Sequence, residues 1–189
     1  CFLKPSGLEF DEVALQDDFE KLADDLLVND TDTFLYRDFN ARNVMVKDGE
    51  PYLIDFQGGR RGPVFYDVAS FAWQARAKFS DSQKEMMLRA YLEAYSQYSS
   101  MDEQEFRSSL RLFVLFRLLQ VLGAYGFRGW IEHKANFVTS IPAAIAELKE
   151  WLTDPSDRYL YLMHTLERLV ALPRFEEDAP EDGVLEVKV

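Results

Sequence analysis

Apolar side chains recur every three or four residues through most of the chain. The first such stretch contains Leu15, Phe19, Leu22 and Leu26 among many acidic residues. This spacing predicts an amphipathic helix over residues 10–28. The same period predicts further helices over residues 67–77, 82–98, 102–125, 141–152 and 156–171. We therefore expect a mostly helical protein.

Polar and small residues mark the ends of several predicted helices. Asp67 stands where a side chain can cap the helix that follows it. Ser82, with Glu85 three residues later, has the spacing of a capping box. Glycines are expected to break the long helix near its end: Gly123, Gly126 and Gly129.

The period changes between the first helix and the helical body. Three short runs are β-prone: residues 34–36, 44–46 and 52–54. Asp48 and Gly49 lie between the last two runs and form a hairpin turn signal. Residues 57–63 hold three glycines and two arginines and are expected to form a loop. The sequence thus predicts one small β-hairpin beside a helical body.

Composition limits the classes of protein to which the chain can belong. With 189 residues, 48 % of them hydrophobic, the chain can bury one sizeable core. Its single cysteine, Cys1, cannot form an internal disulfide, and two histidines leave no zinc-type cluster. The formal net charge of −12 repels nucleic acid. We therefore expect no nucleic-acid partner.

The most apolar stretch, residues 110–122, is interrupted by Arg111, Arg117 and Gln120. It is also expected to be too short to span a bilayer. No signal peptide opens the sequence. We therefore expect no membrane partner and a cytoplasmic location.

Three oxygen-bearing side chains stand beside the β-prone runs. Asp38 and Asn43 are five residues apart, which is the spacing of the kinase catalytic loop. Asp55 ends the second run of the hairpin, which would fold it back beside that loop. A charge at the end of an apolar strand is costly unless it is paired or bound to a metal, which favours a functional role for Asp55. Since carboxylate and amide oxygens suit Mg²⁺, the pattern predicts a phosphoryl-transfer site.

A family resemblance rests on three motifs: Arg37-Asp38-x-x-x-x-Asn43, Ile54-Asp55-Phe56 and Tyr66-Asp67-Val68-Ala69. Together they resemble the aminoglycoside phosphotransferase and choline kinase superfamily, whose fold is like that of protein kinases. In detail the motifs look most like bacterial kinases that phosphorylate N-acetylmuramate and N-acetylglucosamine at the anomeric hydroxyl. The motifs cover about residues 34–71, and the helical remainder agrees in character only.

The resemblance implies a role for each matching residue. Asp38 would be the catalytic base, Asn43 and Asp55 Mg²⁺ ligands, and Asp67, Tyr36 and Arg37 the support of the catalytic loop, with Arg60 and Arg61 as candidate contacts of substrate or phosphate. Simpler explanations exist for some of them. Asp67 can act only as a helix cap, and the two arginines can belong to an exposed basic loop.

The sequence departs from the family pattern in three places. Tyr36 stands where the family usually has histidine, and Gln57 stands where the kinase Asp-Phe-Gly element has glycine. Among the residues before Asp38, Gly7 is the only glycine and no Val-Ala-Ile-Lys-like strand occurs. The glycine-rich phosphate loop and its lysine are therefore not in this chain.

These observations give an expected fold and domain organisation. The fold class is α+β: a protein-kinase-like C-terminal lobe, mostly helical, with a small β-hairpin carrying the catalytic loop and the N-lobe absent. Residues 1–173 would form this lobe. Residues 174–189 would be an acidic linker and the start of a strand that leads to a further domain.

The expected function is ATP-dependent phosphorylation of a small-molecule hydroxyl acceptor, with Mg²⁺ as cofactor and ATP as co-substrate. The arginines of residues 57–63 favour an amino sugar such as N-acetylmuramate or N-acetylglucosamine. The missing N-lobe of the same polypeptide is an expected partner, and the chain alone should be inactive. Two alternatives stay open: an aminoglycoside or choline-type kinase, and a pseudokinase or binding module that regulates an attached domain.

Overall fold

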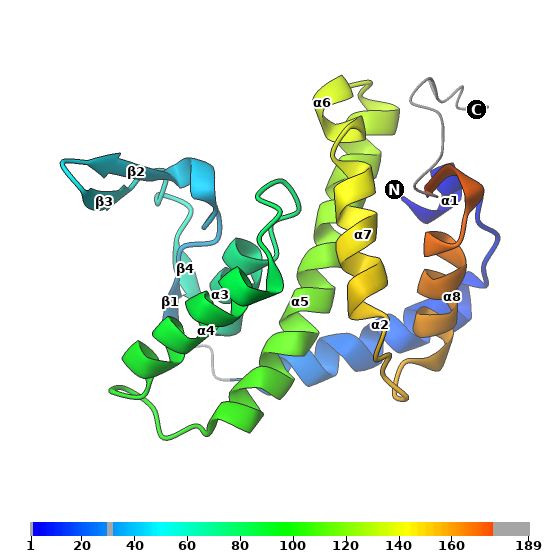
Figure 1. Ribbon diagram of the computed structural model, residues 1–189. Helices are drawn as coiled ribbons and strands as arrows, with labels where there is room; N and C mark the ends of the chain where they lie inside the picture. Colours follow the sequence, from blue (N-terminus) through cyan, green and yellow to red (C-terminus); the bar gives the residue numbers. More distant parts are fainter. Residues whose placement is uncertain (1, 30–31, 176–189) are drawn as a thin grey trace. The chain divides into compact units, whose positions relative to one another are not determined.

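The computed structural model describes residues 2–29 and 32–175, which form two compact units (Figure 1). One unit contains the residues up to Asp24 and those from Leu118 onward, and the other is Asp25–Arg117. The elements are α1 (Leu3–Ser6), α2 (Glu12–Leu27), β1 (Thr33–Leu35), η1 (Ala41–Asn43), β2 (Val44–Lys47), β3 (Glu50–Leu53), β4 (Arg60–Gly62), α3 (Phe65–Ala72), α4 (Asp81–Tyr95), α5 (Glu103–Tyr125), η2 (Gly126–Ile131), α6 (Ala135–Val138), α7 (Ile141–Trp151), α8 (Leu160–Val170) and η3 (Pro173–Phe175).

The strands of the Asp25–Arg117 unit form two separate antiparallel pairs, β1 with β4 and β2 with β3. The predicted hairpin is confirmed: Asp48 and Gly49, with φ of 54° and 84°, make the turn between β2 and β3. Positive φ at both central residues is what a tight two-residue hairpin turn requires. Figure 1 shows this hairpin projecting away from α3 and α4.

The loop predicted over residues 57–63 is wrong in part, because Arg60–Gly62 is strand β4. It pairs with β1 in the register Thr33 to Gly62 and Leu35 to Arg60. A three-residue strand without apolar alternation has no recognisable pattern of its own. The pairing of β4 with β1 brings together the two ends of the segment that carries the predicted catalytic loop.

Two predicted helix caps are also wrong. α3 begins at Phe65, so Asp67 lies inside its first turn rather than at its N-cap, and the helix ends at Ala72. The capping box of α4 is formed by Ser80 and Gln83, two residues before the predicted pair. Ser80 accepts a hydrogen bond from the Gln83 backbone, and the Gln83 side chain accepts one from the Ser80 backbone. The carboxylates of Asp67 and Glu85, which do not act as caps, have other hydrogen-bond partners.

Aromatic side chains form the core of the Asp25–Arg117 unit. The ring of Phe65 on α3 lies 5.1 Å from that of Phe106 and 5.4 Å from that of Phe113, both on α5. Tyr91 and Tyr95 of α4 pack against the same Phe106 ring. Burial of each large apolar side chain contributes about 1.5–3 kcal/mol. This core fixes α3, and α3 in turn carries Asp67 to the catalytic loop.

The long helix extends further than predicted, because α5 passes through Gly123 and continues into the π-helical turn η2. The continuous helical stretch Glu103–Ile131 has the length and mean hydropathy of a membrane-spanning segment, so the expectation that it is too short was wrong. A core helix has the same composition. Many of its apolar residues are buried within the protein: Phe106, Leu110, Phe113, Val114, Leu115, Leu118 and Leu122. The absence of a membrane partner and the cytoplasmic location stay predictions.

The other unit is helical. Its core is formed by apolar residues of α7 and α8, among them Ile145, Leu148, Leu162 and Leu166. Asp18 is buried on the apolar face of α2. Burial of this carboxylate is possible because it accepts a hydrogen bond from the Leu162 N–H, at 2.9 Å, near the start of α8. The helical elements and the small sheets are compatible with the predicted α+β class. The acidic linker and terminal strand expected over residues 174–189 lie almost entirely outside the described residues.

Candidate active site

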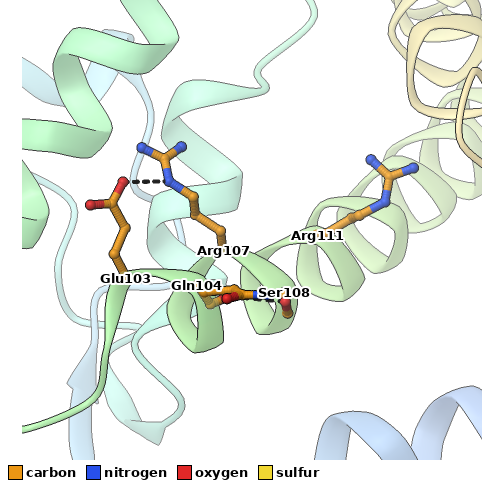
Figure 2. Close-up of a pocket in the computed structure, with 5 residues that line it drawn as sticks. All are labelled: Glu103, Gln104, Arg107, Ser108 and Arg111. Carbon is orange, nitrogen blue, oxygen red and sulfur yellow. Dashed lines mark hydrogen bonds and ion pairs between the residues drawn. The ribbon is translucent and has the colours of Figure 1, made fainter.

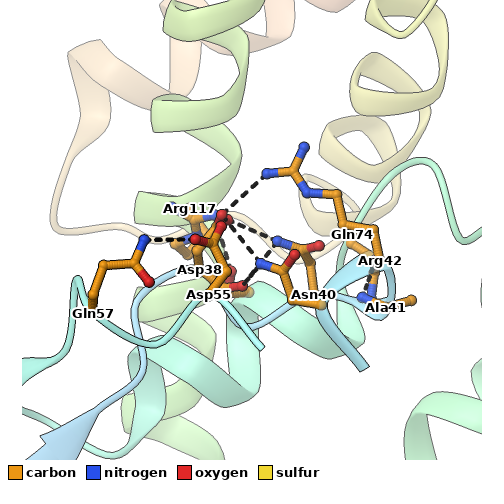
Figure 3. Close-up of polar contacts among 10 residues, drawn as sticks. Asp38, Asn40, Ala41, Arg42, Asp55, Gln57, Gln74 and Arg117 are labelled. Atoms are coloured by element: carbon orange, nitrogen blue, oxygen red, sulfur yellow. Dashed lines mark hydrogen bonds and ion pairs between the residues drawn. The ribbon is translucent and has the colours of Figure 1, made fainter. Parts of the chain in front are cut away.

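The segment between β1 and β2 forms a loop that is held by its own side chains. Asp38 is half-exposed and accepts three side-chain hydrogen bonds. Asn40 Nδ2 lies 2.7 Å from Asp38 Oδ1, while Arg42 Nη2 and Asn43 Nδ2 lie 3.1 Å and 3.2 Å from Asp38 Oδ2 (Figure 3). Together the three N–H donors fix the direction of the carboxylate, which can accept all of them.

Asn43 is buried, with 5 % of its surface exposed. Its amide nitrogen also donates to the Asp38 carbonyl oxygen at 2.8 Å. With the nitrogen so engaged, the oxygen Oδ1 is the group that can act as a ligand. The backbone carbonyl of Asn43 accepts the Ile54 N–H at 3.0 Å, which ties the loop to the residue before Asp55.

Asp55 follows β3 in the left-handed backbone region, with φ of 68°. Asp55 is exposed, so the expectation that its charge lies in a costly apolar setting was wrong. Gln57 Nε2 donates to Asp55 Oδ1 at 2.6 Å. No other hydrogen bond reaches the Asp55 carboxylate from the residues that the structure describes, which leaves Oδ2 available to a ligand.

The Tyr36 hydroxyl is affected by the charges of carboxylates from both the catalytic loop and the segment after β3. Its side chain is buried, and within the described parts of the chain its hydroxyl has no hydrogen-bond partner. Burial raises the pKa of Tyr36, and the negative charges of Asp55, Asp38 and Asp67 raise it further. The geometric link between the two sides is the Ile54 N–H bond to the Asn43 carbonyl, which joins the segment that carries Asp55 to the loop that carries Asp38.

Asp67 supports the catalytic loop from α3. Its two carboxylate oxygens accept the backbone N–H groups of Tyr36 and Arg37 at 2.5 Å and 2.9 Å. Burial raises the pKa of Asp67, although these two bonds and the charge of Arg117 act in the opposite direction. Arg37 itself has a φ of 73°, a conformation that costs a non-glycine residue roughly 1–2 kcal/mol. The carboxylate holds the chain in that conformation.

Arg117 of α5 holds α3, the helix that carries Asp67. Its guanidinium donates to the Tyr66 hydroxyl at 2.7 Å and to Ser70 Oγ at 3.0 Å. One sequence signal points to such a role, because a cation within an apolar run needs a polar partner when it is buried. Its partners lie about fifty residues away in the chain and could not be identified from that signal.

Two further residues of the loop's surroundings were missed. Gln74 Oε1 accepts the Ala41 N–H at 3.1 Å, and its Nε2 donates to the Phe71 carbonyl at 2.8 Å. No pattern in the sequence links residues 33 positions apart. Arg42 had a local signal, since a cation four residues after an acid commonly pairs with it in helical turns.

The two arginines of β4 differ in their partners. Arg61 forms an ion pair with Asp32 at 2.9 Å, and both side chains are exposed. The Arg60 side chain makes no hydrogen bond or ion pair with any described residue. Because Arg60 is paired with Leu35 in the sheet, its backbone lies next to the start of the catalytic loop. Of the two, Arg60 is the one available to a ligand.

The metal-binding capacity of the site rests on Asn43 Oδ1 and Asp55 Oδ2. The described residues contain no cluster of three His, Cys, Asp or Glu side chains able to hold a metal ion. Mg²⁺ does not require one, because it is commonly bound through one or two protein oxygens, water and substrate phosphates. The donor set therefore fits Mg²⁺ delivered together with a nucleotide.

A surface pocket of about 460 Å³ lies elsewhere, along the first turns of α5 (Figure 2). Its lining residues are Glu103, Gln104, Arg107, Ser108 and Arg111. Two of them form an ion pair, Arg107 Nε to Glu103 Oε1 at 2.8 Å. The pocket shares no residue with the predicted site.

Comparison with known proteins adds one match. The sequence model of the phosphotransferase enzyme family matches residues 5–103. No curated protein sequence matches the chain significantly. The matched segment includes every residue to which the sequence motifs assigned a site role.

Proposed function

The chain belongs to the phosphotransferase enzyme family, and from this premise we propose that it supplies the catalytic groups of an ATP-dependent small-molecule kinase. The family match covers more than half of the chain and confirms the resemblance at that level. The contact between Asn43 and the Asp38 carboxylate carries the proposal, because it joins the two catalytic-loop residues while the Asn43 carbonyl is bonded to Ile54, the residue before Asp55.

In this proposal Asp38 orients the acceptor hydroxyl and accepts its proton. Its carboxylate is half-exposed, so an acceptor can approach it, and the donors from Asn40, Arg42 and Asn43 fix its direction. A carboxylate that is already fixed in direction needs little reorganisation when the hydroxyl attacks. Asn43 and Asp55 would hold Mg²⁺. When bound, the metal would supply positive charge to the phosphate oxygens.

The test is Asp38→Asn in the complete encoded polypeptide. We expect kcat for ATP-dependent phosphorylation to fall by about 10²–10⁴, the usual contribution of a general base, with the far-UV spectrum unchanged. Asp48→Asn is the matched control, because Asp48 lies in the hairpin turn and should leave kcat unaltered. Equal activity of Asp38→Asn and wild type would contradict the catalytic role of Asp38, and no activity in either protein would favour the binding-module alternative.

We further propose that a nucleotide-binding lobe of the same polypeptide covers the β2–β3 hairpin, and that this chain is the C-terminal lobe. The support is a set of exposed apolar side chains, named the hairpin patch: Met45, Val46, Tyr52, Leu53, Ile54 and Phe56, which are 44–70 % exposed. The hairpin is a sheet of only two strands. Such a sheet is marginally stable in water unless its apolar face is covered.

The hairpin patch can be tested with two valines that are each 70 % exposed, Val46 in the patch and Val13 on α2. In the complete polypeptide, Val46→Lys should raise the KM for ATP about tenfold, because it places a charge in an apolar interface. Val13→Lys should leave the KM unchanged. The same effect from both substitutions would contradict a covering lobe. Residues 1–189 alone should show no kinase activity.

For the acceptor we propose an amino sugar, with N-acetylmuramate or N-acetylglucosamine as the first candidates. Arg60, which has no described partner, is the residue best placed to meet a sugar acid or phosphate. The net charge of −12 favours instead a cationic acceptor such as an aminoglycoside. A panel of N-acetylmuramate, N-acetylglucosamine, kanamycin and choline decides between them. Phosphorylation of kanamycin or choline alone would reverse this order.

A further inference from the structure

The carboxylate of Asp55 differs from that of Asp38 in how it is held. Asp38 accepts bonds on both oxygens from three side chains, whereas the described residues give Asp55 a single donor, the Gln57 amide. The Gln57 Nε2 to Asp55 Oδ1 distance of 2.6 Å shows that the two side chains are directly hydrogen-bonded. Figure 3 shows the amide beside the carboxylate.

We propose that Gln57 is a positioning residue that fixes the Asp55 carboxylate for metal binding, an inference that rests on the proposed phosphotransferase function. The amide holds Oδ1 and leaves Oδ2 for the cation. No other hydrogen bond from the described residues restricts the side chain, and Asp55 is exposed and follows a strand whose residues are all exposed. Without Gln57 the carboxylate would rotate freely, and ordering it would reduce the affinity for metal.

The chemistry of the side chain suits this task. Asp55, Asp38 and Asp67 all act on the Tyr36 hydroxyl, so the site concentrates negative charge that attracts a divalent cation. A lysine or arginine at position 57 would orient Asp55 but would neutralise the charge that the cation needs. A neutral amide donor orients the carboxylate and preserves its charge. Glycine, which stands at this position in the related kinase element, can do neither.

The experiment measures Mn²⁺ binding by the loss of its free EPR signal, in the complete polypeptide with the non-hydrolysable ATP analogue AMP-PNP. Gln57→Ala should weaken Mn²⁺ binding about tenfold or more, the usual effect of removing a hydrogen-bond partner of a metal ligand. It should also raise the Mg²⁺ concentration for half-maximal activity, while kcat at saturating Mg²⁺ stays within about twofold. Gln16→Ala is the matched control, because Gln16 also donates to an exposed carboxylate, that of Glu20, at 2.9 Å.

Asp55→Asn separates the failure of this inference from that of the proposed function. If Asp55→Asn abolishes Mn²⁺ binding while Gln57→Ala binds like wild type, only the positioning role of Gln57 is overturned. If neither Asp55→Asn nor Gln57→Ala changes binding, or if the wild-type protein binds no Mn²⁺, the metal site itself is overturned. Weaker binding by both, with Gln16→Ala unchanged, supports the role of Gln57.

Discussion

The catalytic loop and the β2–β3 hairpin, which contribute opposite sides of the candidate site, are stabilised in different ways. The loop is braced from outside its own segment by Asp67, which holds two of its backbone N–H groups, and by Gln74, which holds a third. The hairpin has only its own ladder and turn, and its apolar side chains are exposed. Contacts within this chain brace the base side of the site, whereas the described residues give the hairpin no such brace, which is the basis of the proposed covering lobe.

The largest effect is expected from removing the support of the loop. Asp67→Ala leaves the N–H groups of Tyr36 and Arg37 without their acceptors. We expect the free energy of unfolding, measured by urea denaturation, to fall by about 2–4 kcal/mol. Asp67→Asn keeps one acceptor oxygen and should cost less than half as much. If Asp67→Ala were as stable as wild type, Asp67 would not brace the loop, and the loop would not differ from the hairpin in this respect.

A smaller effect is expected in the helices below the loop. Glu85 of α4 accepts two bonds from Arg107 of α5, at 2.9 Å and 3.0 Å, and one from Arg89 at 2.8 Å. The hydrogen bonds from Arg107 are the main reason that the pKa of Glu85 is lowered from 4.5 to about 2. Because Glu85 is partly exposed, Glu85→Gln should cost only about 1 kcal/mol at pH 7.

The sign of the pH dependence follows from that lowered pKa. The stabilisation by Glu85 is fully present above pH 4.5 and is lost as the pH falls towards 2. The stability difference between wild type and Glu85→Gln should therefore shrink over this interval. Urea denaturation at several pH values measures it. A constant difference down to pH 2 would show that the carboxylate charge contributes nothing to the contact between α4 and α5.

The smallest effect on the free energy of unfolding is expected at Tyr36, whose hydroxyl makes no hydrogen bond with the described residues that support the loop. The buried Tyr36 hydroxyl has no partner among the described residues and lies in the field of three carboxylates. Tyr36→Phe removes an unpaired polar group and should leave the free energy of unfolding unchanged or raise it by up to about 1 kcal/mol. A loss of more than 1 kcal/mol would mean that the hydroxyl has a stabilising partner. Thermal and urea unfolding both provide the measurement.

Local patterns predicted the hairpin and the contact between Asp38 and Asn43, whereas distant contacts were not predictable. Asp48-Gly49 encodes its turn through its own backbone preferences, and the spacing of Asp38 and Asn43 is sufficient to bring them into contact. The bond from Tyr36 to Asp67 and the pairing of Leu35 with Arg60 join residues 25–31 positions apart. Such contacts depend on where the core places α3, which no short pattern records.

The same limit explains the incorrect expectation for Asp55. An apolar run such as residues 52–54 predicts a buried strand, because apolar side chains are usually covered by the rest of the fold. In the structure this strand is exposed, and Asp55 with it. Sequence can show that a segment is apolar, but it cannot show which surface covers it.

We propose that Asp38, Asn43 and Asp55 serve one metal-dependent phosphoryl-transfer site. A crystal structure of the complete polypeptide with Mn²⁺ and AMP-PNP is the decisive test, because the anomalous signal locates the metal. We expect a Mn²⁺ peak within about 2.5 Å of both Asn43 Oδ1 and an Asp55 carboxylate oxygen, with the Asp38 carboxylate beside it but not ligating. A metal bound elsewhere, or to only one of those two side chains, would contradict it.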